Sequence, residues 1–196
     1  EEYKEKLEQI PEEKRCEVHP QIGTPIIDKL SYTTNDEIAD LFTTLLANAS
    51  NIDMVNTAHP SFVSIIERLS PDEAKLIRYL NGKNQICYCN FQGNVLDGNG
   101  YITIRDHITT LTKDVLLDYP QNVSAYLANL ISLGLLLDMD GTYFVDENFY
   151  KRIIEKSQYD NLCKALVPNH YKSITIEKSY YKVTDFGKLF IKSCVK

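Results

Sequence analysis

The chain has 196 residues, 43% hydrophobic and 24% charged, so it can bury the core of one large domain or of two small, closely packed domains. Its formal net charge of −6 argues against a general nucleic-acid coat, because phosphate binding needs clustered Lys and Arg. No run of about 20 apolar residues is present, so the sequence contains no candidate for a membrane-spanning helix.

The first part of the chain is charged, and we expect residues 1–23 to form a linker with a frayed helix at its start. The sequence begins with Glu1 and not with Met, which suggests a piece of a longer protein with a further segment upstream. Thr24 and Pro25 then resemble a helix cap followed by a first turn, and they open a predicted helical subdomain over residues 24–84.

Two helical patterns dominate that subdomain. Over residues 34–51, Thr34 and Glu37 are spaced as a capping box, and apolar residues recur on one helical face. Over residues 58–80, two helices meet at Ser70-Pro71, where Glu73 completes a second capping box. The predicted apolar face of the first helix consists of Ile38, Leu41, Phe42, Leu45, Leu46 and Ala49.

Strand patterns begin only after residue 84. We predict hairpins over residues 85–105, 135–145 and 171–183, a helix from Pro120, a long helix over 147–166, and a final helix capped by Thr184. The predicted fold is therefore mainly α with small β-hairpins, an α+β protein. Its N-terminal helical bundle packs on a winged-helix-like α+β subdomain, residues 85–196, and the two form one compact unit.

Four segments together resemble a known family. They are LEQIPEEKR with the short proline-linked helix after it, NDEIADLFTTLLANAS, AHPSFVSIIERLSPDEA, and the pair YLANLISLGLL and YYKVTDFGKLFIKSC. In this order they resemble the Abi-alpha family, bacterial domains linked to abortive phage infection, from about Leu7 onward. The last pair is the least specific, since many winged-helix proteins share its pattern.

The resemblance implies a bacterial antiviral role without an established enzymatic activity. It supplies no catalytic residue, and the sequence itself predicts no cofactor and no metal site. The resemblance also implies an Ala- and Gly-rich, partly apolar segment upstream, which is absent from this sequence and would act as the effector. We therefore expect a cytoplasmic, non-enzymatic domain that acts through protein or membrane-proximal binding, with membrane association only through the upstream segment.

A DNA-binding regulator is the alternative hypothesis. It would use the winged-helix-like part and a basic C-terminal stretch, in which six lysines from residue 172 onward face two acidic residues. Residues 119–137 contain no Lys or Arg, however, so nucleic acid is the less favoured partner, after a protein or a second copy of this chain. The candidate binding face consists of Lys172, Lys178, Lys182, Lys188 and Lys192.

The remaining reactive residue types have local structural explanations. The five cysteines are irregularly spaced, and Cys87 and Cys89 fit neither a redox pair nor half of a zinc site, so we expect reduced thiols. The scattered histidines lack metal-binding spacing, and His59 is expected to cap or pack at a helix start. The acidic side chains lie in predicted turns or in the first turn of a predicted helix, which gives them a structural role. A hydrolase would also require a pocket with converging polar groups, which only a structure can show.

Overall fold

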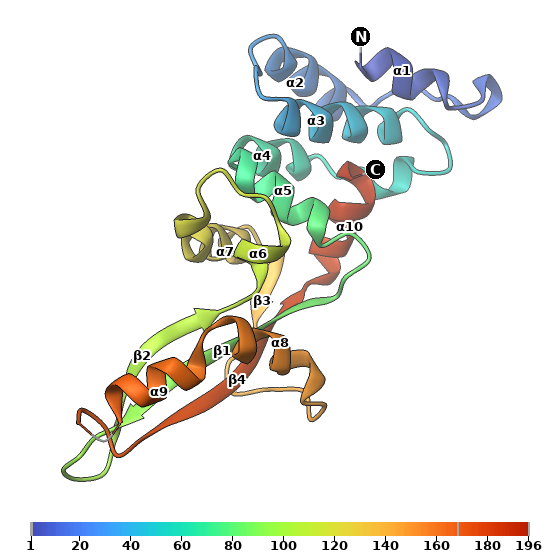
Figure 1. The fold of residues 1–196 in the computed structure, drawn as a ribbon. Coiled ribbons are helices and arrows are strands. Elements are labelled where there is room, and N and C mark those ends of the chain that lie inside the picture. Colours follow the sequence, from blue (N-terminus) through green and yellow to red (C-terminus); the bar gives the residue numbers. More distant parts are fainter. Residues whose placement is uncertain (1, 168, 196) are drawn as a thin grey trace. The chain divides into compact units, whose positions relative to one another are not determined.

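A computed structural model describes residues 2–167 and 169–195 and contains both helices and a β-sheet (Figure 1). The chain forms two compact units, and each unit consists of segments that are separated in the sequence. Unit 1 comprises the described parts of 1–83, 115–136 and 183–196, and unit 2 comprises 84–114 and 137–182. The α+β class is confirmed, whereas the division expected at residues 23 and 84 stays a prediction.

Unit 1 consists of helices arranged around α3 (Asp36–Ala49). The predicted apolar face is confirmed, because Leu41, Phe42 and Leu45 are almost completely buried. Helices α1, α2, α4, α5 and α10 all contact α3. The other elements of unit 1 are α1 (Glu2–Glu8), η1 (Glu12–Lys14), α2 (Pro20–Leu30), η2 (Val55–Thr57), α4 (Ser61–Glu67), α5 (Pro71–Tyr79), η3 (Pro120–Asn122), α7 (Val123–Ser132) and α10 (Asp185–Cys194).

The predicted corner at Ser70-Pro71 is confirmed. The Glu73 main-chain N–H donates to Ser70 Oγ at 3.3 Å, and the Ser70 N–H donates to Glu73 Oε2 at 2.6 Å. Both bonds satisfy donors that a helix start leaves without an intrahelical partner.

Two other helix starts differ from the prediction. Asn35, and not Thr34, caps α3, since its side chain accepts from the Ile38 N–H. Helix α2 begins at Pro20 with His19 as its cap, so Pro25 lies inside the helix. Both errors are of a few residues, because several residues near each start can cap a helix.

Unit 2 is built on an antiparallel sheet with the strand order β2-β1-β4-β3. The first predicted hairpin is confirmed as β1 (Gln85–Asn94) and β2 (Tyr101–Ile108). Helices α8 (Asn148–Lys156) and α9 (Tyr159–Leu166) contribute Tyr150, Ile153 and Tyr159 to a core that also contains Cys89 and Phe91 of β1. A short helix, α6 (Leu111–Asp114), follows β2.

The other two predicted hairpins are wrong. Residues 143–145 form no strand, and β3 (Leu136–Asp138) pairs with β4 instead. Residues 173–183 are one strand, β4 (Ser173–Val183), which pairs with β1 along its length. The long helix expected over 147–166 is two helices, separated at Gln158 with a left-handed φ of 59°.

The spacing of Thr184 and Gly187, in the last of the four segments quoted above, has a structural reason. Thr184 caps α10, because its Oγ1 accepts from the Gly187 N–H at 2.8 Å and donates to the Gly134 carbonyl at 2.6 Å. A Cβ atom on Gly187 would lie 2.2 Å from the Leu135 carbonyl oxygen. Only glycine therefore permits this approach of α10 to the chain after α7.

Candidate functional site

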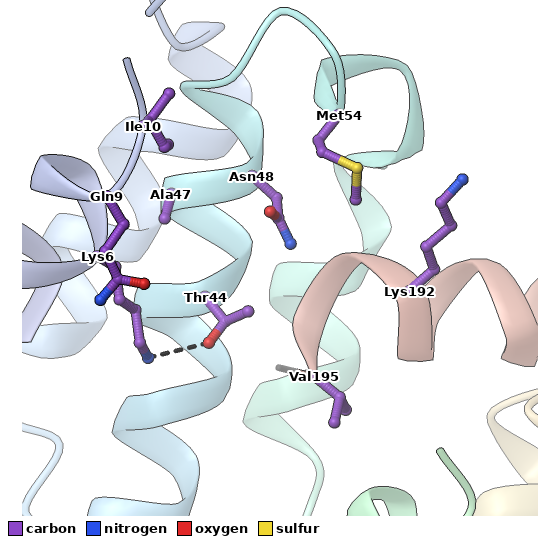
Figure 2. Close-up of a pocket in the computed structure, with 9 residues that line it drawn as sticks. All are labelled: Lys6, Gln9, Ile10, Thr44, Ala47, Asn48, Met54, Lys192 and Val195. Atoms are coloured by element: carbon purple, nitrogen blue, oxygen red, sulfur yellow. Dashed lines mark hydrogen bonds between the residues drawn. The ribbon is translucent and has the colours of Figure 1, made fainter. Parts of the chain in front are cut away.

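A pocket in unit 1 is lined by parts of α1, α3 and α10 and the residues that follow α1 and precede η2 (Figure 2). Its volume is about 250 Å³. Apolar atoms of Ile10, Ala47, Met54 and Val195 form much of its lining, and polar side chains complete it. The polar lining residues are Lys6, Gln9, Thr44, Asn48 and Lys192.

Lys6 is held by a polar network on one side of the pocket. Its Nζ donates to Asp40 Oδ1 at 2.5 Å, to Thr43 Oγ1 at 2.7 Å and to Thr44 Oγ1 at 2.9 Å, and its side chain is 10% exposed. Burial alone would raise the pKa of Asp40, but the hydrogen bonds and charges of its cationic neighbours, Lys6 and Arg78, hold that pKa below its usual value. The charge of Lys6 is thus already neutralised by its neighbours.

Lys192 differs from Lys6 in its surroundings. It projects from the exposed side of α10 beside the pocket, and no ion pair joins it to a carboxylate within residues 2–167 and 169–195 (Figure 2). Asn48 crosses from α3 to α10, where its Nδ2 donates to the Ser193 carbonyl at 2.8 Å. An apolar recess beside an unneutralised cation can accept an apolar side chain that is followed by an acidic group.

The predicted lysine face is distributed over both units. Lys172, Lys178 and Lys182 belong to unit 2, whereas Lys188 and Lys192 belong to α10 of unit 1. Lys178 forms an ion pair with Glu147, and Lys188 lies 3.4 Å from Asp185. Lys172 donates to the Gly98 carbonyl at 3.2 Å, and Lys182 is exposed on β4. Of these five residues, Lys192 alone lines the unit 1 pocket.

The corner at Ser70-Pro71 joins further parts of unit 1. Asp72 is 2% exposed, and its carboxylate accepts from the N–H groups of Asp118 and Tyr119, both at 2.8 Å, and from Tyr126 Oη at 3.1 Å. Burial opposes its charge, but these hydrogen bonds and Lys75 outweigh burial and lower the pKa of Asp72. Asp72 therefore has a structural role, which the sequence did not suggest.

A second cluster that the sequence did not suggest lies in unit 2, where His107 has a left-handed φ of 46°. The ladder between β1 and β2 is irregular there, and the Asn90 side chain accepts from the His107 N–H at 2.8 Å. The His107 ring contacts Tyr181 through a 2.5 Å hydrogen bond, and the Tyr88 hydroxyl donates to Asp138 at 2.7 Å. Bulges often redirect a side chain in this way. Burial raises the pKa of both tyrosines, so they act as neutral partners at ordinary pH.

The cysteines are free thiols in the structure, as expected. Burial raises the pKa of Cys87 to about 11 and that of Cys89 to about 12, so both are protonated near neutral pH and poorly nucleophilic. Over the described residues, no group of three or more His, Cys, Asp or Glu side chains is arranged to hold a metal ion.

His59 follows its prediction, since its Nδ1 accepts from the Ser61 N–H at the start of α4. His19 caps α2. No helix in the part of the chain that the structure describes has the length and apolar character that crossing a membrane requires.

The structure thus defines an α+β protein whose helical unit carries a small, partly apolar pocket with a cationic rim. A family model described as abortive infection alpha matches residues 1–194, so the chain belongs to this family, as the sequence segments indicated. No curated protein matches the chain.

One solved structure is similar to the chain: an uncharacterized protein from the hydrocarbon-degrading marine bacterium Alcanivorax borkumensis SK2, with 15% sequence identity and a TM-score of 0.40. The similarity covers 68% of this chain and 94% of the other.

Proposed function

We propose that this chain acts in abortive infection as a non-enzymatic binding domain, and that its unit 1 pocket accepts a segment of a protein partner. Family membership supports the biological role. The observation that carries the binding mode is Lys192, an exposed cation beside a recess that contains Met54 and Val195.

The recess suits one kind of contact. A partner side chain of the size of Leu or Met would displace water from the apolar lining and gain roughly 1.5–3 kcal/mol if fully buried. A neighbouring carboxylate would then meet Lys192, which selects an acidic partner over a basic one. The buried network of Lys6 and Asp40 supports the pocket from α1 and α3.

Substitution of Lys192, in a form that includes the preceding sequence, tests this proposal in phage-challenged bacteria. We expect Lys192→Glu to reduce protection by at least about tenfold, equivalent to a loss of about 1.4 kcal/mol in partner binding. Lys188→Glu, which makes the same charge change on the preceding turn of α10, is the matched control and should keep protection. Equal protection by both variants, at equal protein levels, would contradict the assignment of the pocket.

We further propose that a segment upstream of this chain acts as effector and that residues 1–196 regulate it. Expression of residues 1–196 alone and of a longer form that includes the preceding sequence tests this division. Protection by residues 1–196 alone would contradict it.

The alternative of a winged-helix DNA-binding regulator has one supporting observation. Helix α7, strands β3 and β4 and helix α10 follow one another in the order of a winged helix, although α8 and α9 lie between the two strands in the sequence. Against this, Asn129 of α7 already donates to Glu73 and to the Arg68 carbonyl. A steep loss of DNA affinity with salt, removed by neutralising Lys178, Lys182 and Lys188, would favour the alternative.

A further inference from the structure

Strand β4 is much longer than the strand on its outer side. It has 11 residues and lies between β1 and β3, and β3 has only 3 residues. The Thr184 N–H donates to the Leu135 carbonyl and the Met139 N–H donates to the Tyr180 carbonyl, which places β3 against the C-terminal end of β4. In the described chain, the preceding residues of β4 have no strand on that side, and Figure 1 shows this part of β4 at the border of the sheet.

The direction of the main chain shows which groups are available at this border. Because the Tyr180 carbonyl points toward β3, the alternate residues Lys178 and Ile176 point their N–H and C=O groups to the same side. The Ile174 carbonyl follows this alternation, since it accepts from the Tyr159 hydroxyl at 2.6 Å and not from β1. Ile176 and Lys178 thus present main-chain donors and acceptors at the outer edge.

A hollow of about 370 Å³ lies beside these residues. Ile176, Glu177 and Lys178 line one side, and Gly141, Tyr143 and Glu147 line the other. The Ser179 hydroxyl contacts the carbonyl oxygens of Met139 and Thr142, at 2.8 and 3.1 Å, which attaches the opposite segment to β4. We call the three β4 residues 176–178, together with this hollow, the β4 edge.

The segment opposite β4 specifies the chemistry of an occupant. Residues 138–147 contain four acidic side chains and no Lys or Arg. Lys178 is neutralised by its ion pair with Glu147. Tyr143 is 59% exposed and Val145 is 87% exposed, so the same segment also offers apolar surface. An extended segment that alternates basic and apolar side chains complements both properties.

We propose that the β4 edge binds an extended, basic peptide segment of a protein partner, which adds to the sheet of unit 2 as a further strand. Main-chain hydrogen bonds to Ile176 and Lys178 would hold the peptide, and Tyr143 and Glu147 would contact its side chains. The proposal uses no residue of the unit 1 pocket, so either proposal can fail without the other.

Fluorescence anisotropy with a labelled Lys-Val-Lys-Val-Lys-Val amide tests this proposal on the intact chain. Two further peptides have the same sequence with N-methylated main-chain amides. One is methylated at the Lys residues and the other at the Val residues, so each blocks the N–H groups along one edge of the extended peptide. Because only one set can face β4, we expect one methylated peptide to bind at least about tenfold more weakly than the parent, and the other to bind nearly as well. No binding of the parent, or equal binding of both methylated peptides, would overturn the proposal.

A protein variant provides the second measurement. Glu147→Lys should weaken binding of the parent peptide by about tenfold, whereas Glu155→Lys on the exposed side of α8, outside the hollow, should leave it unchanged. Circular dichroism establishes that both variants fold. Should Glu147→Lys unfold, the two methylated peptides still decide the question on the unsubstituted protein. Equal weakening by both variants would indicate nonspecific charge attraction and count against the β4 edge.

Discussion

The two units differ in the charge that their interiors contain. Unit 1 buries charge, since Asp72 is 2% exposed and the Lys6 side chain 10% exposed, each within a network of hydrogen bonds. Large rings are buried in both units, but the described core around Phe91 and Tyr150 in unit 2 contains no charged residue. Buried charge is stable only while its partners remain, whereas buried rings depend on volume. The two units should therefore respond to different perturbations.

The largest expected effect is a loss of volume in unit 2. Phe91 is 0% exposed, and its ring packs edge-on against Tyr159 with centroids 5.0 Å apart. We expect Phe91→Ala to lower the free energy of unfolding by about 3–5 kcal/mol, because the cavity cannot fully collapse. Urea unfolding measures this loss, and Phe149→Ala, at a ring that is 43% exposed, is the control with a smaller effect. Equal losses would show that the core is not organised around Phe91.

Removal of a buried charge from unit 1 should cause the second-largest loss in the free energy of unfolding. Asp72→Ala leaves the N–H groups of Asp118 and Tyr119 without their acceptor, and we expect a loss of about 3 kcal/mol. Hydrogen exchange should rise most in residues 70–80 and 115–126, which Asp72 connects. Asp118→Ala removes only an ion pair with Lys75 at a 61% exposed side chain and should cost less than about 1 kcal/mol. An Asp72→Ala protein as stable as Asp118→Ala would contradict this account.

The lowered pKa of Asp72 makes the stability of the chain dependent on pH. The pKa of Asp72 is lower in the folded chain than its ordinary value of about 3.9, so the unfolded chain binds more protons at acidic pH. Its contribution to stability is therefore complete above about pH 5 and is lost as the pH falls through the folded pKa. Urea unfolding between about pH 7 and 3 should show a shallower acid decline for Asp72→Asn than for the unsubstituted chain. Identical declines in the two proteins would show that Asp72 does not contribute to the loss of stability at acidic pH.

The features that the sequence predicted correctly depend on residues that lie close together in the sequence. Ser70 and Glu73 are three positions apart, as are Thr184 and Gly187, and α3 shows its buried face by periodicity alone. Strand β4 was predicted as a hairpin because Glu177, Lys178 and Ser179 resemble a turn. In the structure Glu177 instead accepts from Asn90 and Gln92 of β1, more than 80 positions earlier in the chain.

The candidate site was predicted only in part for the same reason. Lys192 belonged to the predicted lysine face, but Lys6, Asn48 and Met54 line its pocket from distant segments with no shared motif. The left-handed φ of His107 could not be predicted from its residue type, since histidine adopts that conformation only in a small minority of cases. Long-range strand pairing and packing determine both features, and neither can be read from local spacing.

The smallest expected effect concerns a polar contact at the border of unit 2. Tyr159→Phe keeps the ring against Phe91 but removes the 2.6 Å hydrogen bond to the Ile174 carbonyl. That carbonyl faces away from β1 at the outer edge of β4, and a single neutral hydrogen bond contributes about 1 kcal/mol to stability, so we expect a loss of only that size. Tyr101→Phe, at a side chain that is 60% exposed, is the control and should change stability by less than about 0.5 kcal/mol. A loss from Tyr159→Phe as large as that from Asp72→Ala would mean that unit 2 depends on polar contacts as strongly as unit 1, and the contrast between the two interiors would fail.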